Sequence, residues 1–318
     1  MSTSHSQSQL STENKVALQA RHNRPLGGDT ARNTRSSVIV DLSERVLNNE
    51  SLTQLVQSRK PSWIRAKLPG GKGYEAMRKN MAEHGLSTVC QEASCPNIGD
   101  CWERGTATIM ILGDVCTRSC GFCNVRTGKP APPDFDEPQN VGKSIALMGL
   151  RHIVITCVDR DDLHDGGAEI WASTIEETHR QAPDTSVEVL VGDFGGDRDA
   201  LQTVIRAQPE ILAHNLETVP RMHGAVRPQA KYERSMEVLM QIRDSGLVSK
   251  TGIMVGIGET DDEVYTLLED VQKRAETEII TIGQYLQPTR NHLPVDRWVH
   301  PDKFESYKKI GLDLGFRV

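Results

Sequence analysis

Three of the seven cysteines in this sequence, Cys116, Cys120 and Cys123, fall within eight positions of the stretch "GDVCTRSCGFCNVRTGKP". A structural zinc site or a fully ligated iron–sulfur cluster usually takes four protein ligands. Three thiols without a fourth nearby in the sequence therefore predict a metal centre with one open coordination position, where a small molecule can bind. A 4Fe–4S cluster with one open iron fits this spacing. The alternative is a zinc site completed by a distant histidine.

A second group of three cysteines precedes the first. Cys90, Cys95 and Cys101 lie in "VCQEASCPNIGDCWERGTAT", again without an obvious fourth ligand. We interpret this group as the site of an auxiliary iron–sulfur cluster, and the alternatives are a structural zinc site or buried free thiols. The seventh cysteine, Cys157, lies among β-branched residues and is expected to fill the core.

Composition limits the classes of protein to which this metal chemistry can belong. The net charge of -6 and the pI near 6.0 argue against a general nucleic-acid-binding protein. No apolar run approaches the roughly 20 residues of a membrane helix, and the polar amino-terminal sequence lacks a signal-peptide core. We therefore expect a cytoplasmic protein with no membrane or nucleic-acid partner. Clustered cysteines in a reducing compartment suit metal binding better than disulfides.

The elements that must position the cysteines alternate along the chain. Six β-rich runs are separated by amphipathic helical stretches, which predicts an α/β protein with a parallel sheet covered by helices. Either a doubly wound sheet or an incomplete TIM-type barrel fits six such units, and in both the loops after the strands carry the active site. The loop with Cys116 follows the first run. The runs are 106–112, 151–158, 186–192, 210–217, 250–259 and 278–287.

Helix signals and composition divide the chain. Thr260 and Glu263 form a capping-box pattern, and Pro301 and Gly315 mark the start and end of a last helix. The amino-terminal residues are too polar to bury a core and are predicted to be disordered. We expect the second cysteine group to lie in a segment that closes over the catalytic face of the barrel. The predicted units are a disordered arm (1–58), an auxiliary-cluster segment (59–103), the barrel (104–300) and a carboxy-terminal helix (301–318).

The CxxxCxxC motif after the first strand, with the aromatic Phe122 before its third cysteine, resembles the radical S-adenosylmethionine (SAM) superfamily. The resemblance implies a partial (βα)6 barrel and a 4Fe–4S cluster on Cys116, Cys120 and Cys123. It further implies that the open iron binds the amino and carboxylate groups of SAM, which is then cleaved to a 5′-deoxyadenosyl radical. The protein would position the cofactor and exclude water.

The spacing of Cys90, Cys95 and Cys101, with the flanking "EASCPN", is similar to the signature of the lipoyl synthase family. This resemblance implies a sulfurtransferase that inserts two sulfur atoms, at C6 and C8, into an octanoyl group attached to a lysine of a carrier domain. The second 4Fe–4S cluster would be the sulfur source. Matching segments run from about Lys60 to Val318: "KPSWIRAKLPGG", "ILGDVCTRSCGFCNVRTGKP", "ITCVDRDDLHDGGA", "HNLETVPR", "GIMVGIGET" and "GQYLQPTRNHLPV".

The resemblance also implies contacts to SAM. Asp161 or Asp162 would face the methionyl amine, Asn215 and Glu217 would reach the ribose or the sulfonium, and Phe122 would lie beside the cofactor. "GIMVGIGE" resembles the strand that flanks adenine. Judged from the residues alone, the aspartates suit a helix cap and turn equally well, and Asn215 and Glu217 could simply close a strand end.

The implied partners are octanoylated lipoyl-carrier domains of 2-oxoacid dehydrogenase complexes, the glycine cleavage H protein, and an electron donor such as ferredoxin or flavodoxin. Seven basic residues against one acidic residue, Glu75, lie between Arg59 and Lys79. This run is either a solvated face or a docking surface for an acidic carrier. Two alternatives to the implied function are another sulfur-inserting radical SAM enzyme, of the biotin synthase kind, and a two-cluster electron carrier.

The sequence departs from the family after "LGF". The family carries an Arg-Ser-Ser-Tyr stretch there, and its serine is the fourth ligand of the auxiliary cluster. The only Arg-Ser-Ser triplet of this sequence, Arg35 to Ser37, lies in the predicted arm. We expect either a sequence that stops before this stretch or an auxiliary cluster without its fourth ligand.

Overall fold

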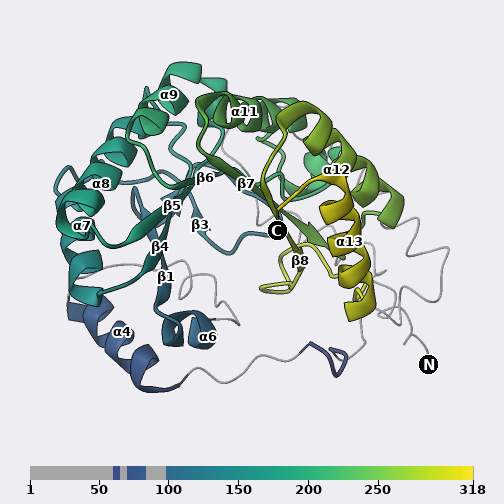
Figure 1. Cartoon of the computed structure of the whole chain (residues 1–318), viewed down its shortest axis with the longest axis horizontal. Coiled ribbons are helices and arrows are strands. Elements are labelled where there is room, and N and C mark those ends of the chain that lie inside the picture. The colour runs from purple at the N-terminus through teal and green to yellow at the C-terminus, as the bar shows by residue number, and fades with distance from the viewer. Residues whose placement is uncertain (1–59, 65–69, 84–97, 318) are drawn as a thin grey trace, which may run out of the picture.

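The computed structural model describes residues 60–64, 70–83 and 98–317 (Figure 1). The predicted disordered arm, Cys90 and Cys95 lie outside the described residues, as does part of the basic run. The described residues thus comprise the barrel, the carboxy-terminal helix and parts of the segment that precedes the barrel.

A six-stranded parallel sheet forms the centre of the molecule. Each strand pairs with the next one along the chain, in the order β1-β4-β5-β6-β7-β8. A doubly wound sheet would reverse its strand order partway, so this order selects the incomplete barrel. The six predicted units are confirmed. The strands are β1 (Thr106–Ile111), β4 (His152–Cys157), β5 (Ser186–Leu190), β6 (Ile211–Ala213), β7 (Val248–Val255) and β8 (Ile279–Gln284).

The sheet is curled, and helices cover its convex face (Figure 1). The Thr260 and Glu263 capping box is present, and Gly315 ends the last helix with a left-handed φ of 109°. The helices are α7 (Glu137–Met148), α8 (Ala168–Gln181), α9 (Arg198–Arg206), α10 (His223–Val226), α11 (Tyr232–Ser245), α12 (Asp261–Ala275) and α13 (Pro301–Leu314), with the 3-10 turns η1 (Phe194–Gly196) and η2 (Pro220–Met222).

Alternation along the strands separates the two faces of the sheet. Ile153 and Ile155 of β4, and Val187 and Val189 of β5, are fully buried under the helices. Because successive side chains of a strand point to opposite faces, the residues between them face the concave side. Burial of these β-branched residues on the helix side is what holds the helices to the sheet.

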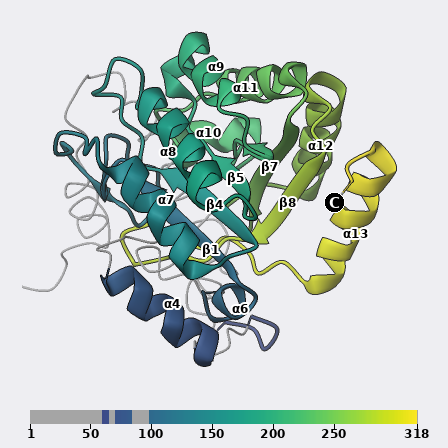
Figure 2. The same ribbon diagram turned by 60° about the vertical axis from the view of Figure 1, so that its left-hand side comes forward.

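The segment that precedes the barrel lies elsewhere than expected. Helix α4 (Lys72–Glu83) packs against α7, and α6 (Ile98–Glu103) leads directly into the amino end of β1 (Figure 2). The ring of Tyr74 stacks on Trp102 with a centroid distance of 5.0 Å. The cysteine loop follows the carboxyl end of β1, so the prediction that this segment closes over the catalytic face is wrong for its described part.

Among the helices described, none is both long and apolar enough to cross a lipid bilayer.

Candidate functional site

The first cysteine of the CxxxCxxC motif is tied to the end of a neighbouring strand. Cys116 ends the two-residue strand β2 (Val115–Cys116), which pairs with β3 (Arg126–Thr127). Its Sγ accepts hydrogen bonds from the backbone N–H groups of Arg118, at 3.4 Å, and Asp159, at 3.3 Å. Because Asp159 lies just beyond β4, these bonds place the motif over the carboxyl end of the sheet.

The other two cysteines are held by segments from much later in the chain. The N–H of Gly121 donates to the carbonyl of Val226 at 2.7 Å, and the Gly121 carbonyl accepts from the N–H of Leu293 at 3.0 Å. The Nε2 atom of His292 lies 3.0 Å from the carbonyl oxygen of Cys123. A Cβ at position 121 would come within 2.8 Å of the Leu293 Cδ1 atom, so glycine permits this close approach.

The three thiols fit an iron–sulfur cluster. Burial raises the pKa of Cys116 to about 11 and raises the pKa of Cys120 and Cys123 as well. Thiols in this environment stay protonated until a metal takes them as thiolates and compensates their charge. Within the described ranges, no three His, Cys, Asp or Glu side chains converge as the ligands of one ion would. A 4Fe–4S cluster instead spreads its thiolates over separate irons.

Arg118, inside the motif, joins it to three aspartates. The guanidinium of Arg118 is bidentate to Asp161, with Nε and Nη2 distances of 2.8 and 2.6 Å. It also lies 2.7 Å from a carboxylate oxygen of Asp193 and 3.4 Å from one of Asp159. Arg118 is only 5% exposed. The arginine therefore ties the cysteine loop to the ends of both β4 and β5.

The predicted SAM-contacting aspartates both pair with arginines. Burial acts to raise the pKa of Asp161, but the hydrogen bonds and charge of Arg118 outweigh it and lower that pKa. Asp162 pairs instead with Arg160, at 2.8 and 2.9 Å, and these hydrogen bonds lower the pKa of Asp162. Arg160 also donates to two backbone carbonyls of the loop before α7. Both carboxylates remain partly exposed.

Asn215 and Glu217 interact with each other just beyond β6, whereas the sequence placed them at the end of the strand itself. Glu217 adopts a left-handed φ of 64° and bridges to β7 through its N–H, which donates to the Gly252 carbonyl at 2.9 Å. Burial raises the pKa of Glu217, while the charge of Arg227 and a hydrogen bond from Asn215 act to lower it. Arg227 also acts electrostatically on Cys120 and therefore connects this pair with the cysteines.

The remaining predicted residues occupy different surroundings. Phe122 packs against the hydrophobic core from the cysteine loop, and Cys157 also packs against the core, as expected. Cys101 lies half-buried on α6, at the opposite end of β1 from the cysteine loop. The glycine-rich turn after β7 is closed by the buried Glu259, whose carboxylate accepts from three backbone N–H groups and pairs with Arg297.

Sequence reasoning missed four charged residues of the site: Arg118, Asp159, Asp193 and Arg227. The signal that could have found the aspartates is their place directly after buried strands, where a charged residue interrupts an apolar run. No sequence pattern identifies Arg118 and Arg227 as site residues, because their partners come from other βα units.

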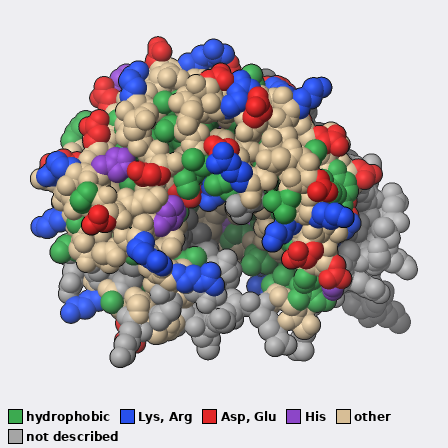
Figure 3. Space-filling model, viewed as in Figure 1, with side chains coloured by type: hydrophobic (Ala, Val, Ile, Leu, Met, Phe, Trp, Pro, Cys, Tyr) green, Lys and Arg blue, Asp and Glu red, His purple; other side chains and the backbone are tan. Residues whose placement is uncertain are grey.

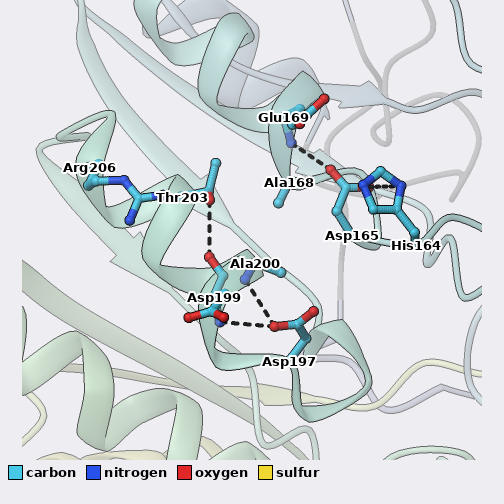
Figure 4. A pocket seen from close by; sticks show the side chains of 9 residues that line it. All are labelled: His164, Asp165, Ala168, Glu169, Asp197, Asp199, Ala200, Thr203 and Arg206. Atoms are coloured by element: carbon cyan, nitrogen blue, oxygen red, sulfur yellow. Dashed lines mark hydrogen bonds and ion pairs between the residues drawn. The ribbon is translucent and has the colours of Figure 1, made fainter.

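A pocket of about 320 Å³ opens at the surface between the amino ends of α8 and α9 (Figure 4). Two of its acidic residues have structural tasks. Asp165 accepts from the N–H groups of Gly167 and Glu169, and Asp197 caps α9. None of the predicted site residues lines this pocket.

The buried Asp193 makes stability depend on pH. Burial opposes its ionisation, but the charge and hydrogen bonds of Arg118 outweigh burial and lower its pKa to about 2. A carboxylate with a depressed pKa stabilises the fold above its unfolded pKa of about 3.9 and loses that contribution as pH falls towards 2. We expect the free energy of unfolding to fall by about 2 kcal/mol over this range through Asp193 alone.

Urea unfolding of the wild type and Asp193→Asn between pH 5 and pH 2 isolates this contribution. The variant should be less stable at pH 5 and less sensitive to acid. Parallel pH profiles for the two proteins would contradict the assigned role.

Comparison with known proteins gives two kinds of match. The family profile for the radical SAM superfamily matches residues 110–271, and that for the N-terminal domain of lipoyl synthase matches residues 4–95. The second match spans the predicted arm and most of the predicted auxiliary-cluster segment.

Curated relatives are similar over most of the chain. A lipoyl synthase from Rubrobacter xylanophilus is 52% identical over 81% of this chain and 80% of its own length. A protein named mitochondrial lipoyl synthase from Nematostella vectensis is 51% identical over 81% of this chain and 89% of its own.

Solved structures match the fold at low identity. Methylornithine synthase (PylB) aligns with a TM-score of 0.52 at 12% identity, covering 75% of this chain and 72% of its own. HydG, a maturase of the [FeFe]-hydrogenase, aligns with a TM-score of 0.53 at 10% identity, covering 96% of this chain and 66% of its own. Both matches support the partial barrel.

Proposed function

The chain belongs to the lipoyl synthase family of the radical SAM superfamily, and from this premise we propose how its six clustered cysteines divide the reaction between them. The function is radical-mediated insertion of two sulfur atoms, at C6 and C8, into a protein-bound octanoyl group. The enzyme is a sulfurtransferase that uses SAM and iron–sulfur chemistry.

Cys116, Cys120 and Cys123 would hold the 4Fe–4S cluster that binds SAM. When bound, the cluster and SAM together supply the deoxyadenosyl radical. The chain itself holds the loop over the carboxyl ends of the strands, through the Arg118 pairs and the Gly121 backbone bonds. This enclosure would limit the access of bulk water to the bound cofactor.

Cys90, Cys95 and Cys101 would hold a second 4Fe–4S cluster as the sulfur source. Cys101 lies at the amino end of β1, whereas Cys116 lies beyond its carboxyl end. The two clusters would then face the barrel centre from opposite ends of one strand. A substrate chain between them could lose a hydrogen atom on one side and gain sulfur on the other.

The SAM contacts belong to the same proposal. Asp161, Asp162 and the backbone around them would face the methionyl amine, and Asn215 and Glu217 the ribose or sulfonium. Phe122 would cover the cofactor from the cysteine loop. The charge of Arg227 acts on both Cys120 and Glu217, and that of Glu217 acts on Cys123, which supports this assignment.

The substrates would be octanoylated lipoyl-carrier domains, including those of 2-oxoacid dehydrogenase complexes and the glycine cleavage H protein. Ferredoxin or flavodoxin would donate electrons. The basic run before α6 would dock acidic carriers. We propose a cytoplasmic location, although the name of the Nematostella vectensis relative assigns that protein to mitochondria.

The observation that carries this proposal is the placement of three half-buried thiols together over the carboxyl end of the sheet. Anaerobic reconstitution should load about eight irons per chain, as two 4Fe–4S clusters require. Mass spectrometry of an octanoylated carrier peptide, incubated with the loaded protein, SAM and a reductant, should then show two added sulfur atoms. Four irons, bound zinc or an unchanged peptide would overturn the proposal.

A further inference from the structure

On the concave face of the described strands, three ionisable side chains lie together, which we call the lumen triad: His152, Glu188 and Lys250. The Nζ atom of Lys250 lies 2.6 Å from Glu188 Oε1, and the Nε2 atom of His152 lies 3.4 Å from Glu188 Oε2. The three side chains come from β4, β5 and β7. The pair Glu188–Lys250 therefore crosses over the intervening strand β6.

Exposure places the lumen triad on the open face. The side chains of His152 and Lys250 are 30% and 24% exposed, although the neighbours of each on the strand are buried under helices. Glu188 is 7% exposed because its two partners cover it. The space-filling view shows a hollow near the centre of the face of the molecule that is turned to the viewer (Figure 3).

Between the lumen triad and the carboxyl ends of the strands, the concave face carries uncharged side chains. Thr156 lies four positions beyond His152, Leu190 lies two beyond Glu188, and Met254 lies four beyond Lys250. Thr156 satisfies its hydroxyl by donating to the Leu190 carbonyl at 3.0 Å. In the described strands, the concave positions between the lumen triad and the carboxyl ends carry no charge. The concave strand positions are thus uncharged between two charged regions, the lumen triad at the amino end and the loops around the cysteines at the carboxyl end.

The two edges of the sheet are not joined. Strands β1 and β8 are these edges and do not pair with each other among the described residues. This inference rests on the proposed function, in which an octanoyl chain must reach the cysteine loop. The chain would lie against the uncharged part of the face.

We propose that the lumen triad is the floor of the acyl site and limits the length of the acyl chain that the enzyme accepts. A chain longer than octanoyl must press its last methylenes against the ion pair, which strips water from the charges without replacing it. Burying a methylene in an apolar site would raise the affinity about fourfold, and a methylene that presses on the ion pair does not provide this increase.

The test replaces the pair by apolar residues of similar size, in Glu188→Leu/Lys250→Met. Single substitutions at these positions would leave an unpaired buried charge. A milder pair, Glu188→Gln/Lys250→Met, guards against loss of the fold. The matched control is Glu233→Gln/Arg274→Met, which removes a 2.6 Å ion pair between α11 and α12 on the outer surface.

Fluorescence anisotropy with carrier peptides bearing octanoyl-, decanoyl- or dodecanoyl-lysine measures binding to the reconstituted proteins. The wild type and the control should prefer octanoyl. In both triad variants the affinity for the decanoyl peptide should rise relative to that for the octanoyl peptide. For Glu188→Leu/Lys250→Met this ratio of affinities should rise about tenfold. If the triad variants bind the octanoyl peptide with the same chain-length preference as the wild type, the lumen triad is not the floor of the acyl site. A wild type that binds none of the acylated peptides would instead overturn the acyl site itself and the proposed substrate with it.

Discussion

Cys120→Ala is expected to abolish formation of 5′-deoxyadenosine from SAM. Two thiolates cannot hold the cluster that leaves one iron open, so the radical is not formed. Cys95→Ala, in the other cysteine group, should leave SAM cleavage largely intact while stopping sulfur insertion. Liquid chromatography of deoxyadenosine and mass spectrometry of the carrier peptide, on the same anaerobic samples, report the two activities separately.

Cys157→Ala is the matched control for both substitutions. Cys157 is the seventh cysteine and packs against the core, so its loss should change stability but neither activity in the folded fraction. If Cys95→Ala removed SAM cleavage while Cys120→Ala preserved it, the roles assigned to the two cysteine groups would be exchanged.

Arg118→Gln is expected to destabilise the fold strongly and to lower its iron content. The substitution leaves the carboxylates of Asp159, Asp161 and Asp193 facing one another without their shared cation. Removing one partner of a buried charge network costs about 3–5 kcal/mol. Iron content should fall as well, because the same arginine ties down the cysteine loop.

Denaturant titration and iron analysis after reconstitution measure these two effects. Arg118→Lys should recover part of the stability but not the bidentate geometry. Arg180→Gln, which removes an exposed bidentate pair with Glu177, should change neither quantity appreciably. Full cluster loading in Arg118→Gln would show that the loop holds its shape without the arginine.

The architecture was predictable because each βα unit has a local sequence pattern, a β-rich run followed by an amphipathic helical stretch. All six β-rich runs overlap an observed strand, although β7 begins two residues before its run, and the capping box at Thr260 starts α12 as predicted. Only three residues of the run 210–217 form a regular strand. From Ala213 to Glu217 the chain advances four positions, whereas its partners on β7, from Lys250 to Ile253, advance only three, so one extra residue interrupts the pairing. The run 250–259 ended early because Glu259 folds back onto the N–H groups of the preceding turn.

The site was predictable only in part. The CxxxCxxC motif and its place after β1 follow from spacing, but the charges around it depend on which loops the barrel brings together. Arg118 and Asp193 form an ion pair although they are 75 positions apart, and no local sequence pattern predicts this contact. The position of α6 at the amino end of β1 was likewise missed, because sequence adjacency to the cysteine loop suggested spatial adjacency.

The backbone contacts that enclose the cysteine loop also set an order of events during synthesis. Cys123 and His292, which meet at 3.0 Å, are 169 positions apart. At roughly 5–20 residues per second, the ribosome delivers His292 about ten to thirty seconds after the cysteines emerge. Throughout that interval the nascent chain presents its thiols without the segment that covers them. Iron delivered after chain release therefore meets a finished enclosure, whereas iron delivered earlier meets one that is still open on the side of Leu293.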